Sequence, residues 1–274
     1  MKRVATIILN RNLPEVTNRL HEHLTRFDAE LTDVYVVEAG SDPEGASRYA
    51  TWTADWPEAK AQGLRFCRGM NFGLSQLWHN GKFNEYDAFF LLTNDTELPN
   101  GPTLQPLMSV LDSHQRVGIL SPCGHRWGER LLLSQQTTKY FWFIHNNALL
   151  LRREFIESIM NREQPDFMHF LFDGSNFRGH GSESELIAKG YANDWAAAIT
   201  TDVFVGENES HLLNQASLIK TEQYEENLRL YLEEGQTWMR NKYGFNSRWS
   251  MQQHVKSFYD SFFDFHPEYR NHQV

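Results

Sequence analysis

Three short polar segments hold the residues of this chain whose types suit ligand chemistry. They are residues 10–12 (Asn-Arg-Asn), 38–42 (Glu-Ala-Gly-Ser-Asp) and 93–97 (Thr-Asn-Asp-Thr-Glu). Each follows directly after an apolar run that reads as a strand. Carboxylate oxygens are the protein ligands that Mg²⁺ and Mn²⁺ prefer, and Asp95 lies in the third segment. If the fold brings the three segments together, the sequence predicts an oxygen-rich ligand site.

The apolar patterns predict the elements that would position these segments. We expect strands at 4–9, 33–37, 88–92, 117–120, 131–134, 140–144 and 198–205. We expect helices at 13–24, 70–78, 104–111, 153–160 and 185–189, and an all-helical region from about residue 212. This alternation predicts the α/β class, with a mostly parallel sheet and helices on both faces. The carboxyl ends of parallel strands share one edge, where ligands of open α/β sheets usually bind.

Size and composition limit the possible classes of protein. The chain has 274 residues, of which 41% are hydrophobic, so it can bury the core of one large domain. We expect a domain over residues 1–211 and a helical C-terminal extension over 212–274. The net charge of -9 disfavours binding to nucleic acid or anionic membranes by general attraction. Only Cys67 and Cys123 are present, which excludes a zinc site made of cysteines and favours a reducing compartment.

The sequence lacks the common glycine-rich nucleotide motifs. No GxGxxG follows the first strand, and no GxxxxGK[ST] occurs anywhere. A nucleotide could still bind if a metal ion held its diphosphate. Mg²⁺ and Mn²⁺ commonly take one or two carboxylates together with phosphate oxygens and water, and Asp95 fits that role.

The order of motifs in the first half resembles the GT-A-fold glycosyltransferases, specifically the family 2-like inverting enzymes. "VATIILNRN" resembles their first strand and nucleotide loop, and "VYVVEAGSD" resembles their second-strand motif, with Glu38 in place of the usual Asp. "RGMNFGLSQ" is similar to their Arg/Gly-x-Asn-x-Gly segment, with Asn71 and Gly73 in register. "LLTNDTELP" is similar to their variant of the DxD motif, in which the last acid, here Asp95, binds the metal.

The second half resembles the family more loosely, so that the resemblance covers roughly residues 3–206. "NNALLLRREFIESI" resembles the acceptor-side strand and the helix after it. "GSESELIAKGY" resembles the Glu-Asp-x-Asp-Leu motif and places Glu183 where the catalytic Asp usually stands. The family often has a metal- or diphosphate-binding His after the last strand. Here that place reads Val205-Gly206-Glu207, with His211 nearby but displaced.

The resemblance implies transfer of a sugar, with inversion, from a nucleoside diphosphate sugar to an acceptor hydroxyl. Mn²⁺ or Mg²⁺ would bind Asp95, with His211 as a further candidate ligand, and Glu183 would act as general base. Glu38 would bind the base or ribose, and Arg68 the diphosphate. The resemblance places the remaining donor-site candidates at Asn10, Arg11, Asn71 and Asn94. Glu97 is expected to be a solvated neighbour of Asp95.

Each residue also has a structural interpretation. Asp95 could be a strand-terminal cap, Glu38 a turn residue and Arg68 a surface residue. Glu183 could be a first-turn glutamate favoured by the helix dipole. A nucleotidyltransferase is the second enzyme reading, although "NRNLPEV" lacks the glycine-rich basic loop expected of one. A catalytically drifted nucleotide- or glycan-binding protein is the non-enzymatic reading.

The partners and location are predicted only in outline. The acceptor could be a glycan, a lipid-linked sugar, a protein side chain or a modified DNA base, and the helical tail could cover the acceptor or form a homodimer. The N-terminus reads as a first strand, not as a signal peptide, and no apolar run is long enough to span a bilayer. We therefore expect a cytoplasmic protein without stable membrane insertion.

Overall fold

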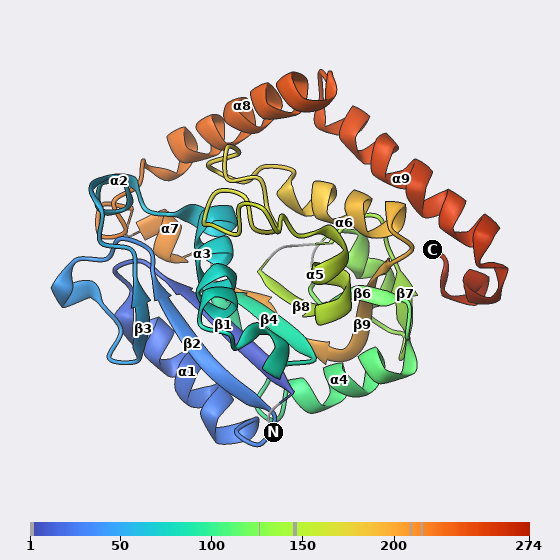
Figure 1. Ribbon diagram of the computed structural model, residues 1–274, viewed down its shortest axis with the longest axis horizontal. Coiled ribbons are helices and arrows are strands. Elements are labelled where there is room, and N and C mark those ends of the chain that lie inside the picture. The colour runs from blue at the N-terminus through green and yellow to red at the C-terminus, as the bar shows by residue number, and fades with distance from the viewer. Residues whose placement is uncertain (1–2, 126, 145–146, 209, 215) are drawn as a thin grey trace.

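A mostly parallel sheet forms the centre of the molecule (Figure 1). The computed structural model describes residues 3–125, 127–144, 147–208, 210–214 and 216–274. Eight strands of these residues form the sheet, in the order β3 (Ala50–Thr53), β2 (Thr32–Glu38), β1 (Val4–Asn10), β4 (Ala88–Thr93), β8 (Ala148–Arg152), β6 (Val117–Cys123), β9 (Ala196–Phe204) and β7 (Thr138–Tyr140). β8 is antiparallel to both neighbours and β7 to β9, while the other neighbouring pairs are parallel.

Helices cover both faces of this sheet, as the sequence predicts (Figure 1). α1 (Pro14–Phe27) and α4 (Leu104–Ser113) lie on one face. α3 (Arg65–His79), α5 (Arg153–Ile159) and α6 (Ser182–Ala192) lie on the other. α3 approaches the sheet closely because Gly73 has no side chain: an added Cβ would lie 2.9 Å from Ile7. Since helices cover both faces, β4 is an almost continuous apolar run, and every residue from Ala88 to Leu92 is buried.

The strand register brings the three polar segments to one edge. Asn10 pairs with Glu38 at the ends of β1 and β2, and Leu9 pairs with Thr93 at the end of β4. Beyond β4 the chain turns at Asp95 into β5 (Thr96–Glu97), which pairs antiparallel with β10 (Gly206–Glu207). This small second sheet joins the segment after β9 to the Asp95 turn.

The C-terminal region is helical, and it packs on the main core. α8 (Tyr224–Tyr243) and α9 (Arg248–Phe265) form an arch over the α3 and α6 side of the molecule (Figure 1). Tyr259 and Phe262 of α9 contact Tyr191 of α6, with ring centroids 5.5 Å apart in each pair. The domain boundary at 211/212 stays a prediction, and it falls inside the short helix α7 (Ser210–Asn214). The remaining helix, α2 (Pro57–Gln62), precedes α3.

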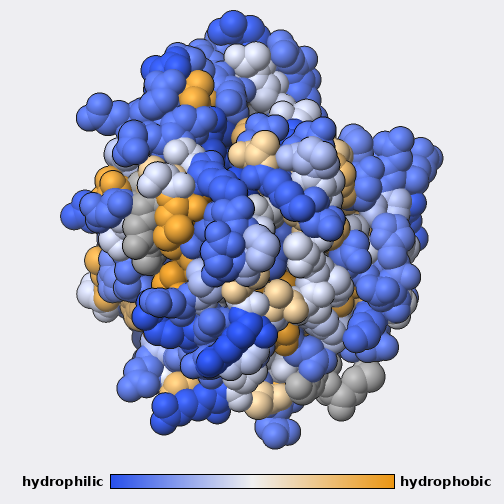
Figure 2. Space-filling view, turned by 90° about the vertical axis from the view of Figure 1, so that its left-hand side faces the viewer, coloured by the Kyte–Doolittle hydropathy of each residue, from blue (hydrophilic) through white to orange (hydrophobic). Residues whose placement is uncertain are grey.

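Two expected strands differ from the structure. Residues 131–134 form no strand, because Trp127–Leu132 is a 3₁₀ helix. The strand expected at 140–144 is β7, which ends at Tyr140. Apolar runs of this length do not distinguish a strand from other buried backbone, and pairing with β9 decides which residues extend the sheet. The side of the molecule on which β3 and α2 lie is mostly hydrophilic, with small separate apolar patches (Figure 2).

Candidate active site

Asn10 links two other predicted donor-site residues, Glu38 and Asn94, at the shared strand edge. Its Nδ2 donates to Glu38 Oε2 at 2.8 Å, and its Oδ1 accepts from Asn94 Nδ2 at 3.3 Å. Glu38 Oε1 accepts from the backbone N–H of Ser47 at 2.8 Å. Asn10 and Glu38 are fully buried, and both oxygens of Glu38 have protein donors. In this conformation the two residues hold the strand ends together, so the geometry adds no support for the predicted contact of Glu38 with a base or ribose.

Arg11 and Asn71 are also occupied by the protein's own backbone. Arg11 donates to the carbonyl oxygens of Ala39 and Ala59, each at 2.9 Å, and of Ile219 at 2.7 Å. Asn71 is fully buried and makes four hydrogen bonds with the backbone of residues 167–172. Asn71 therefore anchors the loop between α5 and α6, and its place in a donor site stays a prediction.

Asp95 lies at the turn between β4 and β5 and is partly exposed. Its carbonyl oxygen accepts from the N–H of Asn208 at 2.9 Å, which holds the segment after β10 against the turn. His211 belongs to that segment, but its side chain is outside the part of the molecule that the structure describes. The described residues contain no cluster of three potential metal ligands among His, Cys, Asp and Glu. Asp95 supplies one carboxylate at this turn, and Mg²⁺ or Mn²⁺ can bind through one or two carboxylates together with phosphate oxygens and water.

Glu183 lies in the first turn of α6, two residues after the N-cap glycine, which has a left-handed backbone (Gly181, φ 83°). Burial raises the pKa of Glu183 from 4.5 to about 7. Its Oε2 is buried and makes no hydrogen bond within the described structure. A carboxyl group with a pKa near neutrality and an unbonded oxygen can accept a proton, which is the chemistry of a general base.

Helix α8 covers the segment before Glu183. His180 contacts Tyr231 of α8, with ring centroids 4.6 Å apart. An added Cβ on Gly235 would lie 2.4 Å from Cβ of His180, so α8 approaches this turn closely only because residue 235 is glycine. Burial lowers the pKa of His180 to about 4, with a smaller effect from the charge of Arg248. Sequence reasoning missed this contact, although a glycine in the middle of a helical pattern signals close packing.

Arg68 lines a cleft beside α8. Its Nε donates to the carbonyl oxygen of Gly174 at 2.7 Å, and its guanidinium lies 4.8 Å from the ring centre of Phe177. It lines an open cleft of about 910 Å³ together with Asp173 and Lys242. The described structure therefore places Arg68 beside a cleft, while its contact with a diphosphate stays a prediction.

Glu97, expected as a solvated neighbour of Asp95, is exposed but also lines a cavity. This cavity of about 220 Å³ lies beside β5 and β10, and its walls include Glu207, His125 and Asn147. A half-open pocket therefore lies beside the strand that follows the Asp95 turn.

Known proteins resemble this chain in structure but not detectably in sequence. No protein-family model and no curated protein matches the sequence. The structure of GalNAc-T7 with UDP, GalNAc and Mn²⁺ aligns with a TM-score of 0.54 and 9% identity over 96% of this chain and 56% of that one. *S. aureus* TarS aligns with a TM-score of 0.50 and 13% identity over 96% of this chain and 44% of that one.

A third similar structure is the mannosyltransferase PcManGT of *Pyrobaculum calidifontis* in complex with GDP-Man and Mn²⁺. It aligns with a TM-score of 0.50 and 13% identity over 94% of this chain and 74% of that one. This chain spans about half the length of the first two proteins. The eight-stranded sheet, the helices on its two faces and these three alignments together show that the chain has a GT-A-like glycosyltransferase fold.

Proposed function

We propose that the chain is a metal-assisted, inverting glycosyltransferase that uses a nucleoside diphosphate sugar. The observation that carries the proposal is Glu183, a half-buried residue at the start of α6 whose Oε2 is buried and whose carboxyl group has a pKa raised to about 7. The fold is consistent with it, since the similar structures include complexes with UDP or GDP-Man and Mn²⁺. Asp95 at the end of β4 supplies a hard oxygen ligand for Mn²⁺ or Mg²⁺.

The reaction requires a nucleophile, a leaving group and a proton acceptor. In the proposed step the acceptor hydroxyl attacks the anomeric carbon from the face opposite the diphosphate, and its proton passes to Glu183. The bond from the anomeric carbon to the phosphate oxygen breaks, and its electron pair leaves with the nucleoside diphosphate. A divalent metal ion held by Asp95 would neutralise the charge that develops on this leaving group. One displacement inverts the anomeric carbon, so no covalent enzyme intermediate is needed.

We also propose that the acceptor hydroxyl belongs to a molecule without phosphate groups. The cavity beside β5 carries the carboxylates of Glu97 and Glu207 in its walls, and the whole chain has a net charge of -9. Both would repel a phosphate-bearing acceptor such as DNA or a lipid-linked sugar, whereas the metal ion would neutralise the diphosphate of the donor. The described residues contain no helix long and apolar enough to cross a membrane. The cytoplasmic location and the homodimer stay predictions.

A turnover assay with Glu183→Gln tests the proposal. The wild-type protein is incubated with Mn²⁺ and a panel of nucleotide sugars, and release of the nucleoside diphosphate is measured. With the active donor, Glu183→Gln should keep donor binding, measured by calorimetry, and lose roughly 10²- to 10⁴-fold in rate. Glu154→Gln is the matched control because it makes the same change in the first turn of α5, where the side chain is exposed. A near-normal rate in Glu183→Gln would refute the general-base assignment.

A further inference from the structure

The segment 218–222, between α7 and α8, lies across the polar edge of the sheet. The carbonyl oxygen of Leu218 accepts from Asn12 Nδ2 at 2.8 Å, and that of Ile219 accepts from Arg11 at 2.7 Å. Lys220 pairs with Asp42, the last residue of the polar segment after β2. Consecutive residues of this segment therefore bind the segments that follow β1 and β2, where a nucleotide would bind under the proposed function.

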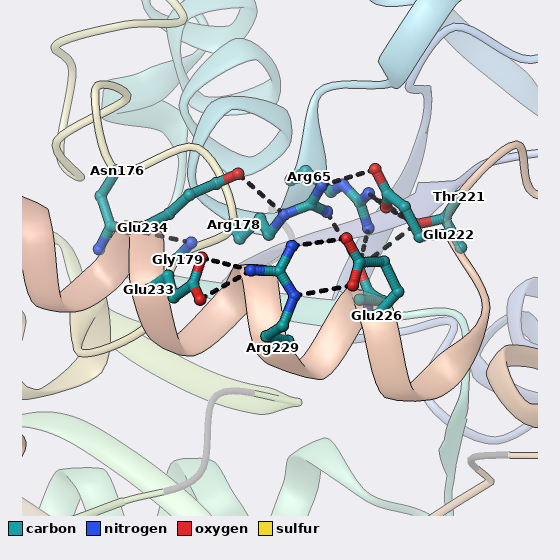
Figure 3. A network of polar contacts seen from close by, with 11 residues as sticks. Arg65, Asn176, Arg178, Gly179, Thr221, Glu222, Glu226, Arg229, Glu233 and Glu234 are labelled. Carbon is teal, nitrogen blue, oxygen red and sulfur yellow. Dashed lines mark hydrogen bonds and ion pairs between the residues drawn. The ribbon is translucent and has the colours of Figure 1, made fainter.

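The same segment ends at two arginines that share one carboxylate (Figure 3). Arg178 Nη2 lies 2.8 Å from Glu222 Oε1, and Arg65 Nη2 lies 3.5 Å from Glu222 Oε2. The guanidinium groups lie 5.6 and 5.8 Å from the ring centre of Phe177. The side chain of Arg178 is only 7% exposed. Two guanidinium groups that bind the two oxygens of one anion have the arrangement that also suits a phosphate group.

Two acidic side chains contact the two arginines: Glu222 contacts both, and Glu234 Oε1 lies 3.1 Å from Arg178 Nε. Burial lowers the pKa of Arg65 to about 10, followed by repulsion from Arg178. Arg65 Nε is buried and makes no hydrogen bond within the described structure. Of the neighbouring acids of α8, Glu226 and Glu233 pair with Arg229 on the helix surface (Figure 3), whereas Glu234 pairs with Arg178.

The backbone of this contact is strained. Among the described residues, four other than glycine have a positive φ, and three of them, Asn12, Arg65 and Lys220, lie here. Such conformations cost free energy and concentrate at binding sites and switch segments.

We propose that Arg65 and Arg178 form an anion site for the phosphate groups of a nucleoside diphosphate, and that Glu222 occupies this site when the ligand is absent. Binding of the ligand then displaces Glu222 together with residues 218–222, and the phosphate groups replace its carboxylate on the two guanidinium groups. Segment 218–222 thus competes with the ligand for the two guanidinium groups. The inference rests on the proposed function for the identity of the ligand, but the anion site itself can be tested without sugar transfer.

The test measures binding of inorganic pyrophosphate by calorimetry at low salt, without a metal ion. Glu222→Gln should bind pyrophosphate roughly tenfold more tightly than the wild type, since the competing charge is removed. Glu226→Gln is the matched control: it removes the same charge from the beginning of α8, but its partner is Arg229. Its affinity should stay within about twofold of the wild type. Equal affinities of Glu222→Gln and Glu226→Gln, or weaker binding by Glu222→Gln, would overturn the competitor role of Glu222.

A second pair of variants tests the arginine site and does not depend on the folding of Glu222→Gln. Arg65→Gln should weaken pyrophosphate binding by roughly tenfold, while Arg229→Gln, on the exposed face of α8, should leave it unchanged. Equal binding by these two variants would overturn the site. Pyrophosphate binding that depends on Arg65, with no turnover of any nucleotide sugar, would support the anion site and contradict the proposed function. Turnover of a nucleotide sugar, with pyrophosphate binding unchanged in Arg65→Gln, would support the proposed function and contradict the anion site.

Discussion

Replacing Glu183 by glutamine should change how the stability of the protein depends on pH. Burial raises the folded-state pKa of Glu183 to about 7, whereas the unfolded chain has the ordinary value of 4.5. The folded protein therefore holds this proton more tightly, and the resulting stabilisation is fully present below about pH 4.5. It is lost as the pH rises through about 7. One pKa unit corresponds to about 1.4 kcal/mol, so the linkage amounts to about 3 kcal/mol in total.

The assay is urea unfolding of the wild type and Glu183→Gln between about pH 5 and pH 8. Over this range the free energy of unfolding of the wild type should fall by roughly 2–3 kcal/mol relative to that of Glu183→Gln. The comparison with glutamine isolates this group, because all other titrations are shared by the two proteins. Glu154→Gln, the exposed control on α5, should follow the wild type at every pH. The same pH dependence in the wild type and Glu183→Gln would refute the buried, proton-holding state, whatever the protein catalyses.

Three further predictions concern the metal, a loop and a helix contact. In the wild type, Mn²⁺ at one hundred times its Kd should stabilise the protein by about 2.7 kcal/mol and so raise its melting temperature. Asp95→Ala should abolish this rise, whereas Glu97→Ala should keep it. A rise retained in Asp95→Ala would exclude the metal role of Asp95. Asn71→Ala removes four hydrogen bonds to the backbone of residues 167–172 and should cost about 3 kcal/mol in urea unfolding. Gly69→Ala places a Cβ 2.3 Å from Leu9 and should cost about 1–3 kcal/mol. In the double variant Gly69→Ala/Leu9→Ala, the loss in free energy of unfolding should be smaller than the sum of the two single losses. A loss equal to that sum would contradict the contact between residues 69 and 9.

Much of the fold could be predicted because its signals are local. Apolar runs such as Ala88–Leu92 predict strands that are buried on both faces, and the structure confirms them. The arrangement of polar segments at one edge also follows from the sequence, since parallel strands must end there. The prediction of a strand at residues 131–134 is wrong, because these residues do not pair with another strand in the described structure. No local pattern reveals whether a pairing strand is present.

The roles of individual side chains at the site depend on packing. The sequence identifies Asn10, Glu38 and Asn71 as polar residues in the right places, but only the fold buries them and satisfies their hydrogen bonds. The sequence presents Arg65 and Arg178 as ordinary arginines more than one hundred positions apart. Their shared contact with Glu222 appears only when the C-terminal segment returns to the start of α3.

The sequence by itself determined the α/β class, the edge at which its polar segments gather and the choice of Asp95 and Glu183 as candidates, because periodicity, turn residues and motif order are properties of neighbouring positions. Only the tertiary structure decided which of those polar groups are occupied by the protein itself. It also determined the raised pKa of Glu183 and the competing anion at Arg65 and Arg178. These properties depend on desolvation and on charges brought together from distant parts of the chain, and neither is encoded in any local stretch of residues.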